Sequence, residues 1–69
     1  MDFLDVVSSV LGVQVTMDTE RRDVEEWDSF THLRLIMEIE HLYHVVIPMH
    51  ELFMINSVRD LYAYVRGNV

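Results

Sequence analysis

The run from Asp28 to about Tyr43 most constrains the fold, because its apolar residues recur with the period of an α-helix. At about 100° per residue, the polar residues fall on one stripe and the apolar residues cover the opposite face. We predict that Asp28 caps this helix and that Ser29 is its first residue. The polar stripe holds Thr31, Arg34, Glu38 and His41, and the apolar face holds Leu35, Ile36, Ile39, Leu42 and Tyr43.

Shorter helices are predicted on both sides of this run. Asp2 to Leu11 has apolar residues at helical spacing, an acidic cap and Gly12 as a stop. Pro48 suits the first turn of a short helix that reaches about Ile55. Ser57 begins a last helix, in which Asp60 completes a capping-box pattern and which Gly67 ends.

The segment from Val13 to Trp27 is a long connection. Its apolar residues alternate at first, which is compatible with a strand, but a lone two-stranded ribbon is marginal. We therefore predict an ordered loop packed on the helices, with Trp27 as its anchor. The expected fold is all-α: a four-helix bundle in one domain, residues 1–69, with a long loop after the first helix and a short third helix.

Charge and composition exclude several classes of function. The chain has twelve Asp and Glu residues against five Arg and no Lys, a net charge of -7. Nucleic acids and anionic membranes are disfavoured as partners, and basic docking surfaces are favoured. Cysteine, a secretory signal and a membrane-length apolar run are all missing from the sequence. We expect a cytoplasmic monomer, and Met1 with the small size favours a free-standing protein.

Ser29 is the candidate functional residue. A serine at a helix start is usually only a cap, but Asp28 already occupies the better capping position. The Ser29 hydroxyl is then expected on an exposed first turn, open to another enzyme. A phosphate joined to it would face the unpaired N–H groups and the positive dipole end of the helix, so the position suits a phosphodiester.

The residues around Ser29 resemble those of the acyl and peptidyl carrier proteins, whose signature is Asp-Ser-Leu at the start of the second of four helices. The resemblance covers nearly the whole chain. It rests on Asp23 to Phe30, His32 to Ile36, Ile39-Glu40, Val46 to Pro48 and Ile55 to Leu61.

This resemblance implies a 4'-phosphopantetheine arm on Ser29, transferred from coenzyme A by a phosphopantetheinyl transferase. Asp28 would position the serine and often the metal used in the transfer. The arm's thiol would carry an acyl group as a thioester among partner enzymes, so the domain itself would be no enzyme. Phe30, Arg34, Met37 and Glu38 would form the face that partners read.

Two residue patterns depart from the family. Phe30 replaces the usual Leu, and the exposed stripe carries Arg34 and His41 where fatty-acid carriers are more acidic. We therefore expect a specialised lipid or secondary-metabolite pathway rather than a housekeeping role. An aminoacyl or peptidyl carrier, and an unmodified helical interaction domain in which Ser29 is only a cap, stay open as alternatives.

Several other patterns have both a functional and a structural interpretation. Phe30 and Met37 lie at one edge of the stripe and are expected to be partly exposed, although such edge residues more often pack in a core than form a docking surface. Ser29 and His32 have the spacing of a nucleophile and its base, but no enclosing pocket is indicated. Neither His41, His44 and His50 nor the acidic cluster at Asp23 to Asp28 has the converging ligands of a firm metal site. A space for a retracted acyl chain is considered beside Leu33, Ile36 and Leu52.

Overall fold

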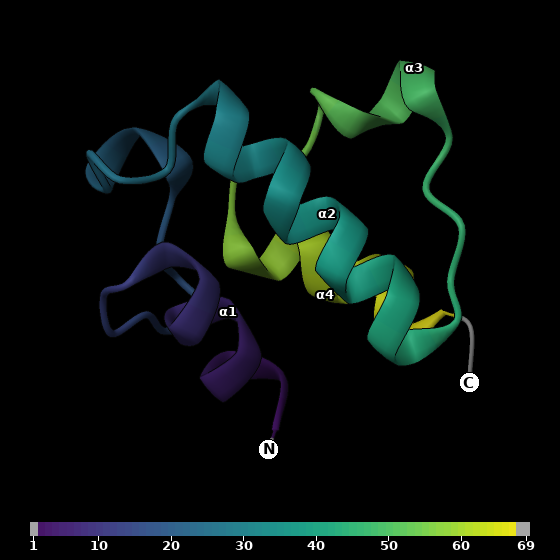
Figure 1. Cartoon of the computed structure of the whole chain (residues 1–69), viewed down its shortest axis with the longest axis horizontal. Coiled ribbons are helices and arrows are strands. Elements are labelled where there is room, and N and C mark those ends of the chain that lie inside the picture. The colour runs from purple at the N-terminus through teal and green to yellow at the C-terminus, as the bar shows by residue number, and fades with distance from the viewer. Residues whose placement is uncertain (1, 68–69) are drawn as a thin grey trace.

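The computed structural model describes residues 2–67, and the prediction of an all-α fold is confirmed. Met1, which entered the expectation of a free-standing protein, lies outside the described residues. Helix α2 runs through the middle of the molecule, with α4 behind it and with α1 and α3 on opposite sides (Figure 1). The helices are α1 (Phe3–Leu11), α2 (Ser29–Tyr43), the short α3 (Met49–Leu52) and α4 (Val58–Arg66). The predicted end of the third helix near Ile55 is wrong, because α3 stops at Leu52 and Pro48 precedes it as the cap.

The predicted caps form with one difference. Asp2 and Asp5 make a capping box at α1, and Gly12 ends that helix with φ 78°, a left-handed conformation that suits glycine. The Ser57 side chain accepts a hydrogen bond from the Asp60 backbone N–H, as predicted. The Asp60 carboxylate, however, accepts from Asn56, one residue before the cap. The reciprocal half of the predicted capping box is therefore shifted by one residue.

One continuous core lies between the helices and the loop. Phe3 joins α1 to α2 and α4 through ring contacts with Tyr43 and Tyr62, at centroid distances of 6.1 and 4.9 Å. The prediction that Leu42 belongs to the buried face of α2 is wrong, because this side chain is 47% exposed. The buried apolar residues are Phe3, Val6, Val7, Leu11, Val15, Trp27, Leu35, Ile36, Ile39, Val45, Ile47, Leu52, Ile55, Val58, Leu61 and Val65.

The long connection is an ordered loop, as predicted, with a single 3-10 turn at Arg21–Asp23. Val15 is buried, and the Thr19 carbonyl accepts a hydrogen bond from the Val58 N–H at 3.0 Å. Within residues 2–67 the only strand-like pairing is an isolated bridge between Glu20 and Ser57. The loop is thus fastened to the start of α4, and its last residues lead directly into α2.

No helix within the described residues is both long enough and apolar enough to cross a membrane.

Candidate functional site

Ser29 lies exposed at the start of α2, and Asp28 leaves it free of the capping role. One carboxylate oxygen of Asp28 accepts a hydrogen bond from the Thr31 N–H at 2.9 Å. Hydrogen bonds from Thr31 lower the pKa of Asp28, so the cap is ionised at neutral pH. The prediction that Asp28 caps α2 and that Ser29 opens it is confirmed.

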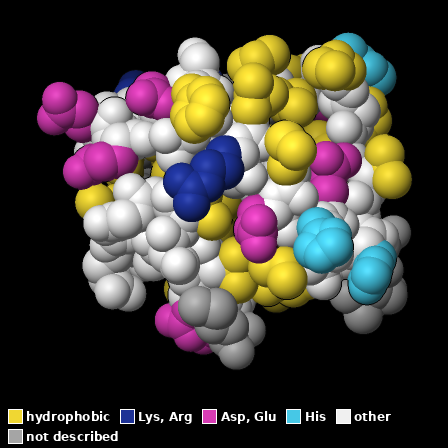
Figure 2. Space-filling model, viewed as in Figure 1, with side chains coloured by type: hydrophobic (Ala, Val, Ile, Leu, Met, Phe, Trp, Pro, Cys, Tyr) yellow, Lys and Arg dark blue, Asp and Glu magenta, His cyan; other side chains and the backbone are white. Residues whose placement is uncertain are grey.

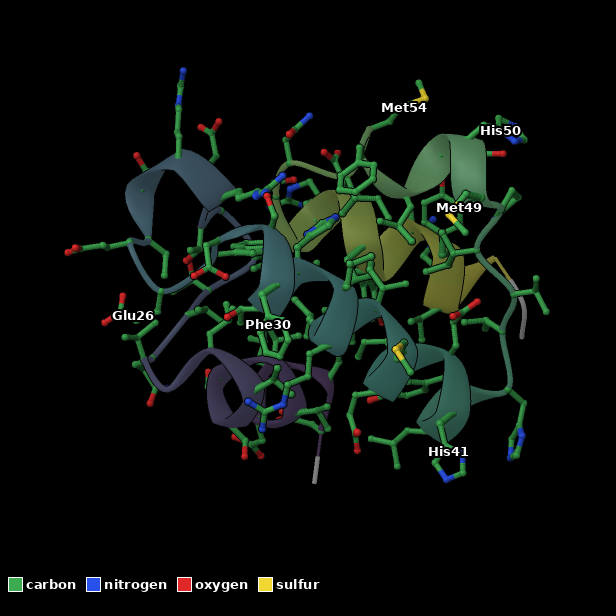
Figure 3. The ribbon with its side chains drawn as sticks, turned by 45° about the horizontal axis from the view of Figure 1, so that its top comes forward. Glu26, Phe30, His41, Met49, His50 and Met54 are labelled. Atoms are coloured by element: carbon green, nitrogen blue, oxygen red, sulfur yellow. The ribbon has the colours of Figure 1, made fainter. Side chains whose placement is uncertain are left out.

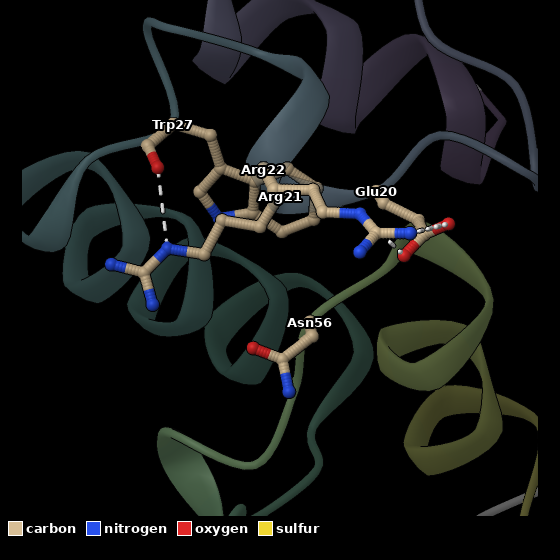
Figure 4. A pocket seen from close by; sticks show the side chains of 5 residues that line it. All are labelled: Glu20, Arg21, Arg22, Trp27 and Asn56. Carbon is tan, nitrogen blue, oxygen red and sulfur yellow. Dashed lines mark hydrogen bonds and ion pairs between the residues drawn. The ribbon is translucent and has the colours of Figure 1, made fainter.

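Arg21 brings a positive charge to the Ser29 hydroxyl. Its Nη2 donates to Ser29 Oγ at 3.4 Å, and its Nε donates to the Trp27 carbonyl at 3.2 Å. Figure 4 shows this side chain beside Trp27, at the wall of a hollow of about 450 Å³ that Glu20, Arg22 and Asn56 also line. Sequence reasoning missed Arg21, because a loop residue eight positions from Ser29 has no periodicity that would indicate the contact.

Trp27 anchors the loop, as predicted, through a buried partner on α2. Its Nε1 donates to Nδ1 of His32 at 2.9 Å, and both side chains are buried. His32 Nε2 lies 2.8 Å from the Leu52 carbonyl. The Trp27 donor requires an unprotonated Nδ1, so His32 is neutral with its proton on Nε2, which donates to Leu52. The imidazole ring of His32 therefore joins the long loop, α2 and α3.

The idea that His32 serves Ser29 as a base is therefore wrong. Both ring nitrogens are occupied, by Trp27 and Leu52, and neither bonds to Ser29. Burial, with a smaller contribution from the positive charge of Arg21, lowers the pKa of His32. The sequence did contain a signal for this burial, since His32, Leu35, Ile36 and Ile39 share one helical face.

An apolar groove lies on the exposed side of α2. It has a volume of about 420 Å³ and is lined by Phe30, Leu33, Arg34, Met37 and Glu38. Phe30 is 76% exposed and Met37 is 68% exposed, so the interpretation of these two residues as core packing is wrong. The structure brings together all four side chains expected to face partners.

The exposed apolar surface continues beyond this groove. Hydrophobic side chains gather over α2 and α3 on the face shown in Figure 2. In Figure 3, Phe30 extends from the first part of α2, while Met49 and Met54 extend from α3 and the residues after it. Exposed apolar residues near α3 are Val46, Met49, Phe53 and Met54.

The remaining predicted features are separate. Ile36 and Leu52 are buried in the core, whereas Leu33 is 40% exposed and lines the outer groove, so these three do not share one internal space. Across residues 2–67, no three or more His, Cys, Asp or Glu side chains converge as a metal site would require.

Comparison with known proteins decides the family. Residues 2–65 match the family model described as the phosphopantetheine attachment site. The chain belongs to this family. It is a carrier domain for phosphopantetheine and not a catalyst, and modification by a phosphopantetheinyl transferase follows from that membership.

Two curated relatives agree with this assignment. The chain is 31% identical to an acyl carrier protein of Helicobacter hepaticus, over 99% of both chains. It is also 33% identical to a 3-methylorcinaldehyde synthase of a Phoma species, over 93% of the chain but only 2% of that much longer synthase. No solved structure matches the chain.

Proposed function

We propose that Ser29 is the residue to which the phosphopantetheine arm is attached, and that the arm carries an acyl intermediate as a thioester. The observation that supports this most is the Ser29 hydroxyl itself. It is exposed on the first turn of α2, is not used as a cap, and lies beside the Arg21 guanidinium. Asp28 would orient this turn for the transferase.

An acyl cargo is supported over an aminoacyl cargo by two observations. The relative that matches from end to end is an acyl carrier protein, and the other relative is a synthase whose product is named as an aldehyde. The Arg34 and His41 side chains are both exposed on α2, a departure that supports a specialised lipid or secondary-metabolite pathway. We propose that residues 1–69 act as one monomeric cytoplasmic domain.

The groove of Phe30, Arg34, Met37 and Glu38 is the proposed docking face for the transferase and acyl-processing enzymes. Its lining is apolar at Phe30, Leu33 and Met37, with one charge of each sign. The net charge of -7 would attract basic surfaces over a longer range. The partner area that meets the groove itself would thus be apolar, framed by basic residues.

The attachment test is a mass measurement on intact protein. Purified protein is incubated with coenzyme A, Mg²⁺ and a promiscuous phosphopantetheinyl transferase. We expect the mass to rise by one phosphopantetheine group in the wild type and in Ser9→Ala, a control that removes another exposed hydroxyl. Ser29→Ala should gain nothing while keeping its helical circular dichroism.

Loading of Ser29→Ala would show that the arm is attached to another residue. A folded wild-type protein that no transferase loads would support an unmodified interaction domain instead. The cargo is then tested by incubating the loaded protein with acyltransferases and with amino-acid-activating enzymes. The mass of the resulting thioester identifies the group that is carried. An aminoacyl product alone would overturn the acyl assignment.

A further inference from the structure

Arg21 is held in place by three hydrogen bonds, one from its backbone and two from its side chain. Its backbone N–H donates to the Asn56 carbonyl at 2.8 Å, which ties the residue to the segment before α4. Its Nε is bonded to Trp27 and its Nη2 to Ser29. The residue is half-buried, so the guanidinium is oriented before any ligand arrives. An oriented group loses less conformational entropy on binding than a free arginine side chain does.

Arg21 forms no close ion pair in the part of the chain that the structure describes, although its positive charge helps to lower the pKa of the Asp28 carboxyl group. Two other arginines have acidic partners: Arg22 with Glu20 at 3.4 Å, and Arg59 with Asp18 at 2.8 Å. For Arg21 no carboxylate oxygen within residues 2–67 comes inside the 4.0 Å limit of an ion pair. Of the five N–H groups of a guanidinium, two are used in the bonds to Trp27 and Ser29. Three remain to bind an acceptor.

We infer that Arg21 binds the phosphodiester through which the arm is joined to Ser29. This inference rests on the proposed attachment at Ser29. Once Ser29 is esterified, its Oγ becomes a bridging oxygen, and two non-bridging oxygens that share one negative charge lie next to it. Arg21 already donates to that Oγ, so its unused N–H groups lie within a side-chain adjustment of the new anion. The planar guanidinium presents donors in the fork arrangement that phosphate oxygens accept.

Binding at Arg21 would also give the arm a starting direction. Arg21 is part of the wall of the hollow lined by Glu20, Arg22, Trp27 and Asn56 (Figure 4). A phosphate held there lies at the edge of this hollow, so the first atoms of the arm are constrained at a fixed position on the domain. Arg21 makes and breaks no covalent bond in this role; it is a phosphate-binding and positioning residue.

The test compares Arg21→Gln and Arg21→Lys with Arg59→Gln, which changes an exposed arginine that is bonded to Asp18 and lies outside the hollow. Each variant is loaded to completion, as verified by mass, and the melting temperature is measured before and after loading. Because each variant is compared with its own unloaded form, a purely structural role of Arg21 cancels. We expect loading to raise the melting temperature by about 4 °C in wild type and Arg59→Gln.

In Arg21→Gln this gain should fall by at least half, and Arg21→Lys should retain part of it. The gain in the wild type should also shrink in high salt, because the interaction is ionic. The phosphodiester ³¹P resonance should shift between Arg21→Gln and wild type but not between Arg59→Gln and wild type. An equal gain and an unchanged ³¹P resonance in Arg21→Gln would overturn the inference.

A last measurement uses only the wild-type protein, so it does not depend on the folding of any variant. In ¹⁵N-labelled wild-type protein, the Arg21 guanidinium resonances should shift on loading and those of Arg59 should not. Unshifted Arg21 resonances in fully loaded protein would equally overturn the inference. Failure of the wild type to load at all is a different result, since it removes the attachment proposal itself.

Discussion

The two segments that flank the start of α2 are built differently. The loop flank, residues 18–27, is held by hydrogen bonds, such as those from Arg21 to Asn56, Trp27 and Ser29, and by the buried Trp27 side chain. The α3 flank, residues 46–54, contains a helix of only four residues and exposes Val46, Met49, Phe53 and Met54. The contacts that join it to the rest of the domain include the Tyr64 hydroxyl donating to the Glu51 carboxylate and the Leu52 carbonyl accepting from His32.

This difference teaches which flank can fix Ser29 and which can adapt. Hydrogen bonds have geometric limits, so the backbone bond of Arg21 to Asn56 and its side-chain bonds to Trp27 and Ser29 hold the serine and Arg21 in a defined relation. A one-turn helix gains little from its own hydrogen bonds and depends on tertiary contacts. Flexible methionine side chains on such a segment suit a surface that meets several partners.

The largest expected effect on stability comes from removing the His32 imidazole, which joins the two flanks. His32→Ala would leave the buried Trp27 N–H and the Leu52 carbonyl unpaired and would open a cavity. We expect the free energy of unfolding to fall by about 2–4 kcal/mol in urea denaturation. Amide exchange should quicken both near Trp27 and in α3.

The control for this variant is His41→Ala, an exposed histidine on the same helix, which should change stability by less than about 0.5 kcal/mol. If exchange quickened in only one flank of His32→Ala, the two flanks would not be coupled through this ring.

A smaller effect is expected from pH. The pKa of folded His32 lies below its ordinary value of 6.5, mainly because burial disfavours the charged ring. As the pH falls through 6.5, His32 therefore binds a proton in the unfolded chain before it does so in the folded chain. This contribution to stability is complete above pH 6.5 and is lost as the pH falls below it toward the folded pKa.

Urea denaturation from pH 7.5 to 5 measures this loss. His32→Gln is the matched variant, because its amide can accept from Trp27 and donate to Leu52 without titrating. We expect a shallower pH dependence in His32→Gln than in wild type. Identical slopes would show that carboxylates, and not His32, cause the loss in acid.

Substitutions in the groove are expected to have the smallest effect on stability but to slow the reaction of the transferase selectively. Phe30→Ser and Met37→Ser remove exposed apolar surface, so stability should change by less than about 0.5 kcal/mol. Loss of a docking contact should lower kcat/KM of the transferase about tenfold. Leu42→Ser is the control, an exposed residue of α2 outside the groove. An equal decrease in all three variants would contradict a dedicated docking face.

The sequence by itself determined the parts of this protein that depend on neighbours along the chain. The four helices, the Asp2, Asp28 and Ser57 caps and the Gly12 stop were predictable, because helical periodicity and capping act over three or four residues. Only the end of α3 differed, at Leu52 instead of near Ile55. The exposure of Ser29 followed from the same local logic, since Asp28 takes the capping role.

Only the tertiary structure decided which side chains meet across the chain. Periodicity gives the side of a helix but not how far its neighbours cover it, so Leu42 was placed on the buried face although it is exposed. His32 is neutral and buried because Trp27 and Leu52, 5 and 20 residues away, supply its partners. Arg21 reaches Ser29 because Asn56 and Trp27 fix the loop. These contacts depend on chain closure in three dimensions, which no short-range pattern encodes.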